Sequence, residues 1–207
     1  VPLASLGHAP RLAVVKTPKW SIATEAQRAN FTEAVAQLKD AGALVRDVPL
    51  PKAFDAAWTV VQAIMDFDAS RGFALVESRH RLQLSQPLTE LLDRGKRIPP
   101  EQHARNLARR DEYRRWLDGL YDGCDAIVTI PAPGEAPQGL ASTGDATFCS
   151  LWTMAGLPAI TLPSGRGPRG LPLGLQVVGR YREDERTLQV AAWCEAALGV
   201  RMGLAGG

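Results

Sequence analysis

The chain of 207 residues is 45% hydrophobic and 22% charged, a soluble globular composition that excludes a disordered chain, a collagen and a coiled coil. Its 24 basic and 22 acidic residues leave a net charge of +2, so total charge indicates no polyanionic partner. The three cysteines lie far apart and outside any paired motif, which argues against disulfides or zinc and favours a reducing, cytoplasmic setting; the apolar stretches are too short for a membrane span.

The beginning of the chain predicts a strand, a helix and a second strand. Residues 11–16 are a short β-branched run typical of a buried strand. Thr24 and Gln27 form a capping-box pattern that starts a helix, and Gly42 ends it. Residues 43–48 then indicate a second strand. A βαβ unit of this kind predicts a sheet that is at least partly parallel.

The middle of the chain predicts helices. Residues 54–95 have a helical pattern with Gly72 as a candidate break, and a further long helix begins after Pro100 and ends near Gly123. The first of these patterns has an apolar stripe formed by Trp58, Val61, Met65 and Phe67. Basic and acidic residues alternate at helical spacing over residues 73–116, which favours a solvated face; a surface for acidic ligands or an RNA backbone is the open alternative.

The last part of the chain alternates strands with glycine and proline. Fifteen of the 34 glycines and prolines lie between Pro131 and Gly174. The predicted elements are strands at residues 125–130, 159–162 and 173–179, a short helix at 145–155 and a closing helix at 183–198. Dense glycine and proline beside strand ends indicate fixed irregular backbone, which is where α/β proteins place ligand sites.

Residues 165–170 match the G-x-G-x-x-G dinucleotide fingerprint and follow a predicted strand. That fingerprint requires a helix whose N-terminal amides hold the pyrophosphate, whereas here a second strand follows. A loop that joins two strands is therefore the favoured interpretation.

Candidate nucleophiles lack their usual context. The motif around Ser142 is one residue too long for a nucleophile elbow, and the three histidines are scattered. Cys149, on the predicted short helix, stays open as a nucleophile, although a small buried apolar residue is favoured. Between Trp116 and Gly165 the chain has no lysine or arginine, and there Asp145 is the best candidate for a ligand contact; its alternative role is a helix cap.

Four segments carry a resemblance to a known family: residues 125–133, 143–145, 151–163 and 170–179. In order and spacing they resemble the C-terminal half of the amidase-signature hydrolases. The opening strand and the closing helix are similar to the same half, so the resemblance covers nearly the whole chain.

The resemblance implies an α/β fold with a mixed, partly parallel sheet covered by helices, and an enzyme that cleaves carboxylic amides without a cofactor. The family uses a Ser/cis-Ser/Lys triad and a backbone oxyanion hole, and the triad lies in its upstream half. This chain has no two adjacent serines, and none of its five lysines stands in the family's catalytic context. We therefore expect no catalytic residue and no metal ligand within it.

The resemblance also implies that this chain contributes the substrate side of the site. The candidate substrate-binding residues are Thr129, Pro131, Asp145, Trp152 and Thr153. For Trp152 and Thr153, packing around the pocket floor stays open as an alternative.

Residues 1–207 are thus expected to be a single C-terminal portion of an amidase-signature domain, with a small-molecule amide substrate and the upstream half as partners. The start at Val1 instead of Met indicates that something has been removed upstream, whether a start residue, a tag or a whole segment. A stand-alone ligand-binding or regulatory module and the amidase subunit of a tRNA-dependent amidotransferase are the alternatives. A nucleic-acid partner is otherwise not favoured, and a homodimer is left open.

Overall fold

The computed structural model describes residues 3–200 and divides into two compact units. Among these, residues 3–52 and 116–200 form what we term the sheet unit, and residues 53–115 form the helical unit. Val1 lies outside the described residues. Short 3-10 turns occur at Trp20–Ile22, Lys52–Ala56 and Arg81–Gln83.

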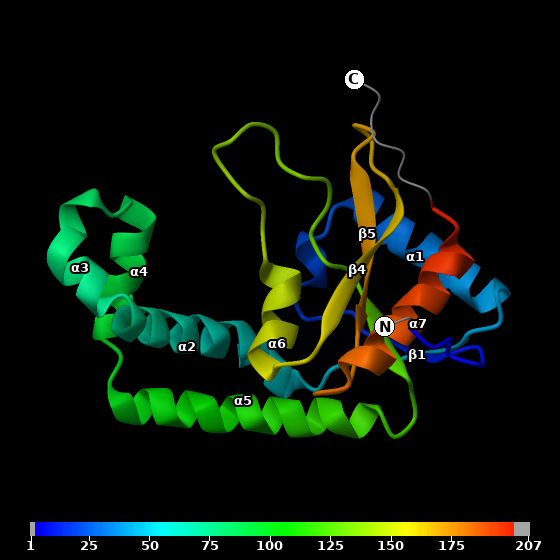
Figure 1. Cartoon of the computed structure of the whole chain (residues 1–207), viewed down its shortest axis with the longest axis horizontal. Coiled ribbons are helices and arrows are strands. Elements are labelled where there is room, and N and C mark those ends of the chain that lie inside the picture. Colours follow the sequence, from blue (N-terminus) through cyan, green and yellow to red (C-terminus); the bar gives the residue numbers. More distant parts are fainter. Residues whose placement is uncertain (1–2, 201–207) are drawn as a thin grey trace. The chain divides into compact units, whose positions relative to one another are not determined.

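The sheet unit is built on a five-stranded sheet with strand order β2-β1-β3-β5-β4 (Figure 1). β1 (Arg11–Val14) pairs in parallel with β2 (Leu44–Asp47) and with β3 (Ala126–Thr129). β5 (Pro172–Val178) runs antiparallel to β3 and to β4 (Ala159–Arg166). The predicted α/β class and mixed, partly parallel sheet are confirmed, and β4 continues beyond its predicted end.

α1 (Glu25–Asp40) connects β1 to β2, as the βαβ prediction requires. The hydroxyl of Thr24 accepts a hydrogen bond from the backbone N–H of Gln27 at 3.2 Å, so the predicted cap is present. After the helix the chain turns at Gly42, whose φ of +104° is a conformation that side chains disfavour.

α1 and α7 (Asp184–Leu198) pack against each other and against β4 and β5, on one face of the sheet (Figure 1). The core between them is apolar and includes Leu12, Phe31, Leu38, Val128, Leu175, Val177, Val190 and Cys194. Cys194 is completely buried in this layer, and burial raises the pKa of its thiol to about 12.

The predicted short helix, the loop between two strands and the closing helix of the sheet unit are also present. α6 (Thr147–Ala155) follows the long connection from β3 and ends at Gly156, whose φ is +69°. Residues 167–171 join β4 directly to β5, which confirms the loop interpretation of the G-x-G-x-x-G match. The closing helix α7 ends at Gly199, also in the left-handed region.

The helical unit contains α2 (Ala57–Gly72), α3 (Ala74–His80), α4 (Gln86–Lys96) and residues 100–115 of α5 (Pro100–Leu120). The candidate break at Gly72 is confirmed. A second break, before α4, separates what the periodicity presents as one helical pattern; Ser85 followed by a proline in the first turn is its sequence signal.

The predicted apolar stripe of α2 is wrong at Met65, which is 48% exposed. The buried face instead carries Val60, Asp66 and Ser70. At Gly95 of α4 a Cβ would collide with the backbone of Asp66 and lie 2.8 Å from the Cβ of Ser70. Because α2 and α4 approach this closely, small and hydrogen-bonding side chains occupy the contact instead of bulky apolar ones.

Candidate functional site

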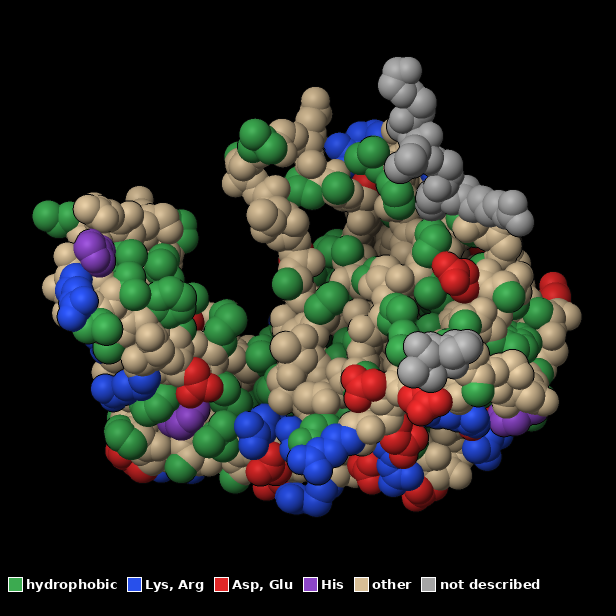
Figure 2. All heavy atoms as spheres, in the orientation of Figure 1, with side chains coloured by type: hydrophobic (Ala, Val, Ile, Leu, Met, Phe, Trp, Pro, Cys, Tyr) green, Lys and Arg blue, Asp and Glu red, His purple; other side chains and the backbone are tan. Residues whose placement is uncertain are grey.

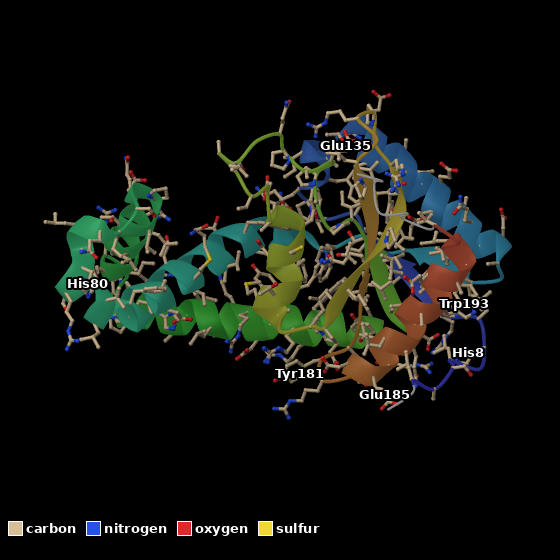
Figure 3. The ribbon with its side chains drawn as sticks, turned by 45° about the horizontal axis from the view of Figure 1, so that its top comes forward. His8, His80, Glu135, Tyr181, Glu185 and Trp193 are labelled. Atoms are coloured by element: carbon tan, nitrogen blue, oxygen red, sulfur yellow. The ribbon has the colours of Figure 1, made fainter. Side chains whose placement is uncertain are left out.

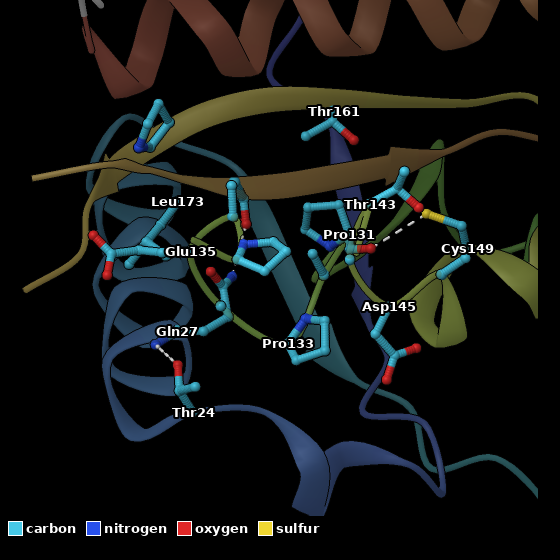
Figure 4. Close-up of a pocket in the computed structure, with 18 of the residues that line it drawn as sticks. Thr24, Gln27, Pro131, Pro133, Glu135, Thr143, Asp145, Cys149, Thr161 and Leu173 are labelled. Atoms are coloured by element: carbon cyan, nitrogen blue, oxygen red, sulfur yellow. Dashed lines mark hydrogen bonds between the residues drawn. The ribbon is translucent and has the colours of Figure 1, made fainter. Parts of the chain in front are cut away.

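A cavity of about 920 Å³ lies in the sheet unit beyond the end of β3 (Figure 4). Its walls come from the N-terminal end of α1, the connection between β3 and α6, the first turns of α6, and facing parts of β4 and β5. The lining residues are Thr24, Gln27, residues 131–137, residues 142–146, Cys149, residues 161–163 and residues 172–174. The stretch rich in glycine and proline thus supplies most of the wall, as its composition indicates.

One wall, residues 131–137, is held against the start of α1. The backbone N–H of Thr24 donates to the carbonyl oxygen of Pro133 at 2.7 Å. A Cβ at Gly134 would lie 2.8 Å from the Thr24 hydroxyl oxygen, so this close approach needs a glycine. The prolines fix φ along the same stretch, and the irregular wall therefore has a defined path.

Gln27 connects α1 to β5, which forms another wall of the cavity. Its side chain is 1% exposed and donates from Nε2 to the carbonyl oxygen of Gly174 at 2.8 Å. A Cβ at Gly174 would lie 2.8 Å from Cγ2 of Thr161 and 3.0 Å from Cγ of Pro131, so β5 comes close to both neighbours. The sequence indicates Gln27 as a capping residue, and its role in the wall depends on tertiary packing that spacing does not reveal.

Glu135 connects residues 131–137 to the turn between β4 and β5 (Figure 3). Its Oε1 accepts from the backbone N–H groups of Arg169 and Leu171 at 3.0 and 2.9 Å, and its Oε2 accepts from Nε of Arg169 at 3.1 Å. Burial acts to raise the pKa of Glu135, but the hydrogen bonds from Arg169 and Leu171 outweigh it and lower the pKa. The carboxylate is therefore ionised at neutral pH.

Asp145 lines the cavity and also stabilises the start of α6. Its Oδ1 accepts from the backbone N–H of Thr147 at 2.8 Å. The helix-start role that the sequence left open is thus present, from the position before the capping residue Ala146.

The structure brings two of the five predicted substrate-binding residues, Pro131 and Asp145, to the cavity. Thr129 on β3 and Trp152 on α6 are completely buried, and Thr153 is exposed on α6. None of these three is part of the cavity lining. For Trp152 the packing role is therefore present, and substrate contact by all five residues stays a prediction.

The two candidate nucleophiles, Ser142 and Cys149, both line the cavity. Cys149 is half-buried and donates from Sγ to the carbonyl oxygen of Pro131 at 3.2 Å; the Ser142 hydroxyl accepts from the N–H of Gly144 at 3.1 Å. Among the described residues that line this cavity there is no histidine, lysine or arginine. Neither side chain therefore has a histidine or lysine in the lining to activate it.

Residues 3–200 contain no group of three histidine, cysteine, aspartate or glutamate side chains placed to hold a metal ion. The helices within this range are too short or too polar to cross a membrane.

The chain matches the family model described as "Amidase" over residues 3–188. It is 31% identical over 201 residues to a glutamyl-tRNA(Gln) amidotransferase subunit of Roseobacter denitrificans, covering 80% of this chain and 40% of that protein. A shorter match of 108 residues to the corresponding subunit of Mesorhizobium japonicum is 40% identical, covering 47% of this chain and 20% of that protein.

Solved structures show the same fold. A crystal structure of an amidase superposes with a TM-score of 0.79 at 25% identity, covering 94% of this chain and 47% of that one. A 6-aminohexanoate cyclic dimer hydrolase superposes with a TM-score of 0.74 at 19% identity, covering 95% of this chain and 46% of that one. The chain thus spans less than half the length of these relatives.

Proposed function

Because the chain belongs to the amidase-signature family, we propose that it is the C-terminal portion of an enzyme that hydrolyses a carboxylic amide, with its Ser/cis-Ser/Lys triad outside these 207 residues. The cavity bounded by residues 131–137 and β5 is then one wall of the substrate pocket. The observation that carries the proposal is this cavity, whose lining offers hydrogen-bonding groups and two candidate nucleophiles but no histidine or lysine to activate them.

The chemistry of amide hydrolysis explains which groups this chain supplies and which must come from outside it. A serine hydroxyl needs a base to become nucleophilic, and the tetrahedral oxyanion needs oriented donors. The sequence has no adjacent serines, and its relatives are more than twice as long as the matched part of this chain. What this chain supplies is a wall that positions the substrate and excludes water from one side of it.

The proposal is tested by measuring ammonia or amine release from a panel of short carboxylic amides. We expect no turnover above background from the pure 207-residue polypeptide, and turnover from a polypeptide that also carries the family's triad-bearing half. Turnover by a sample whose intact mass matches the 207 residues would overturn the placement of the triad.

Asp145 provides the residue-level test in the active polypeptide. If the carboxylate contacts substrate, Asp145→Ala raises KM by about tenfold, whereas a helix-start role alone lowers the melting temperature and leaves KM unchanged. Ser150→Ala is the matched control, because the Ser150 hydroxyl donates to the carbonyl oxygen of Ala146 at the start of α6 and Ser150 lies outside the cavity lining. An unchanged KM for Asp145→Ala would remove Asp145 from the substrate-binding set.

A second candidate function comes from the names of the relatives. A match of 201 residues to a glutamyl-tRNA(Gln) amidotransferase subunit favours the amidase subunit of a tRNA-dependent amidotransferase. If the basic helix α5 contacts RNA in this role, tRNA binding weakens with salt and is lost on charge reversal at Arg109 and Arg110. Binding that is insensitive to both would exclude α5 as the contact.

The stand-alone ligand-binding module is the remaining alternative. It predicts ligand binding by the 207-residue chain and no gain of amide hydrolysis when the triad-bearing half is joined to it. The turnover measurement above therefore decides between this alternative and the leading proposal.

A further inference from the structure

Hydrogen bonds join three parts of the cavity lining to one another: the start of α1, residues 131–137, and β5 with the turn before it. From α1, Thr24 holds residues 131–137 through the Pro133 carbonyl, and Gln27 holds β5 through the Gly174 carbonyl. Glu135 then joins residues 131–137 to the β4–β5 turn, which leads directly into the part of β5 that faces the cavity. Each of these three parts is therefore fixed to the other two, and Glu135 makes the link that does not involve α1.

The contacts of Glu135 exceed those of an ordinary surface ion pair. Exposed pairs contribute little, because water screens them and two long side chains must be ordered. Here the Glu135 side chain is 8% exposed, and its carboxylate accepts two backbone N–H groups as well as the guanidinium. Arg169 Nη2 also donates to the carbonyl oxygen of Ala136 at 2.6 Å, so the turn contacts the segment at two successive residues.

Gly167, at the start of the turn, provides the space for this arrangement. A Cβ there would overlap Cγ and Cδ of Glu135. The φ of Gly167 lies outside the left-handed region, so the need for glycine arises from the Glu135 side chain and not from the backbone conformation.

We propose that Glu135, with Arg169 as its partner, is a positioning residue that fixes the 131–137 wall of the cavity and thereby sets substrate affinity. The affinity part of the proposal depends on the amide-hydrolase function proposed above; the positioning part does not. When the link is broken, residues 131–137 separate from the turn. Cys149, which is half-buried and whose thiol donates to the Pro131 carbonyl, then becomes more accessible.

The thiol of Cys149 reports on the wall without any need for catalysis. Alkylation by iodoacetamide, located by peptide mass spectrometry, gives a rate for Cys149, while the buried thiols of Cys124 and Cys194 report unfolding in the same sample. We expect Glu135→Ala to raise the Cys149 rate on the order of tenfold, because a local opening is no longer opposed by charge-assisted hydrogen bonds. The rates at Cys124 and Cys194 stay unchanged.

Two further variants separate the geometry from the charge. Gly167→Ala retains both Glu135 and Arg169 but displaces the carboxylate, so it should raise the Cys149 rate like Glu135→Ala. Glu135→Gln keeps the shape and one acceptor oxygen, so it should raise the rate less. The matched control is Asp118→Asn, which removes another carboxylate paired with an arginine, Arg180, outside the cavity lining; it should leave the rate unchanged.

In the amide-hydrolysing polypeptide the same variants should raise KM about five- to tenfold and leave kcat within about twofold, as expected for a residue that positions and does not react. Unchanged Cys149 labelling in both Glu135→Ala and Gly167→Ala would overturn the positioning role. Faster labelling with an unchanged KM would leave the positioning role in place and overturn the assignment of this cavity to the substrate. If Glu135→Ala does not fold, Glu135→Gln takes its place in the test. Unchanged Cys149 labelling in both Glu135→Gln and Gly167→Ala would then overturn the positioning role.

Discussion

The sheet unit and the helical unit bury different kinds of side chain. In the sheet unit, aliphatic residues of the strands pack against α1 and α7, together with aromatic residues such as Phe31 of α1. In the helical unit the buried apolar residues are Phe54, Ala57, Val60, Leu92 and Tyr113, and they share the interior with Asp66, Ser70, Glu77 and Asn106. Several large apolar side chains of this unit are instead exposed, namely Met65, Phe73, Leu75, Val76 and Leu82 (Figure 2).

Charge pairing between helices compensates for the smaller apolar core of the helical unit. The buried carboxylate of Asp66 accepts from Nε of Arg94 at 2.8 Å, and Glu77 accepts from Nζ of Lys96 at 2.6 Å and from Arg81. The prediction that the mixed charges of residues 73–116 form a solvated face is therefore incomplete. Alternating charge at helical spacing also builds contacts between helices when a carboxylate is buried at a close crossing.

The apolar side of this contrast is tested by Phe31→Ala. Phe31 is 2% exposed and contacts Trp20 edge to face, with ring centroids 5.1 Å apart. Its truncation leaves a cavity in the core, so we expect a loss of about 4 kcal/mol in the free energy of unfolding, measured by urea denaturation. A loss below about 1 kcal/mol would show that this core does not dominate the stability of the sheet unit.

The polar side is tested by Asp66→Ala, with an expected loss of about 3 kcal/mol, since Arg94 and Gln62 lose a buried partner. Amide hydrogen exchange should rise in α2 and α4. Asp68→Ala is the control on the same helix, because the Asp68 side chain is 60% exposed, and it should cost under about 1 kcal/mol. Equal effects of the two substitutions would contradict the role given to charge pairing in the helical unit.

The sheet unit also contains a charged group with a largely buried side chain, Asp125, which pairs with Arg11 and Arg186. The pH dependence of stability measures the contribution of this group. Burial acts to raise the pKa of Asp125, but hydrogen bonds from Arg11 and Arg186 outweigh it and lower the pKa to about 2. A lowered carboxyl pKa stabilises the fold above its ordinary value of 3.8, and this contribution is lost as pH falls from about 4 towards 2.

We therefore expect the wild-type chain to exceed Asp125→Asn in free energy of unfolding by about 1 kcal/mol at pH 6, after allowance for solvent screening. The difference should shrink as pH falls below about 4, measured by denaturation at a series of pH values. A difference that is independent of pH would show that the ionised carboxylate of Asp125 is not what stabilises this contact.

The sequence predicts the sheet unit well because local signals there agree with the final structure. The Thr24 cap, the short β-branched runs and the glycine stops mark elements whose limits are set locally. Prediction fails where tertiary contact decides, as at Met65, which the close approach of α2 and α4 leaves on the surface. Gln27 and Glu135 each form hydrogen bonds to residues more than thirty positions away in the chain, and no local spacing pattern predicts such pairs.

The edge strand β4 has a consequence for how the protein behaves in concentrated solution. Among the described strands β4 pairs with β5 alone, and an unpaired strand edge is a template on which another copy can add. The proline at position 163 lacks an N–H, and the register shifts between Pro163 and Gly165. Both features interrupt the regular hydrogen-bond ladder that pairing between molecules requires. We therefore expect residues 163–166 of β4 to resist pairing with another copy, and residues 159–162 to be the part of this edge where such pairing can occur.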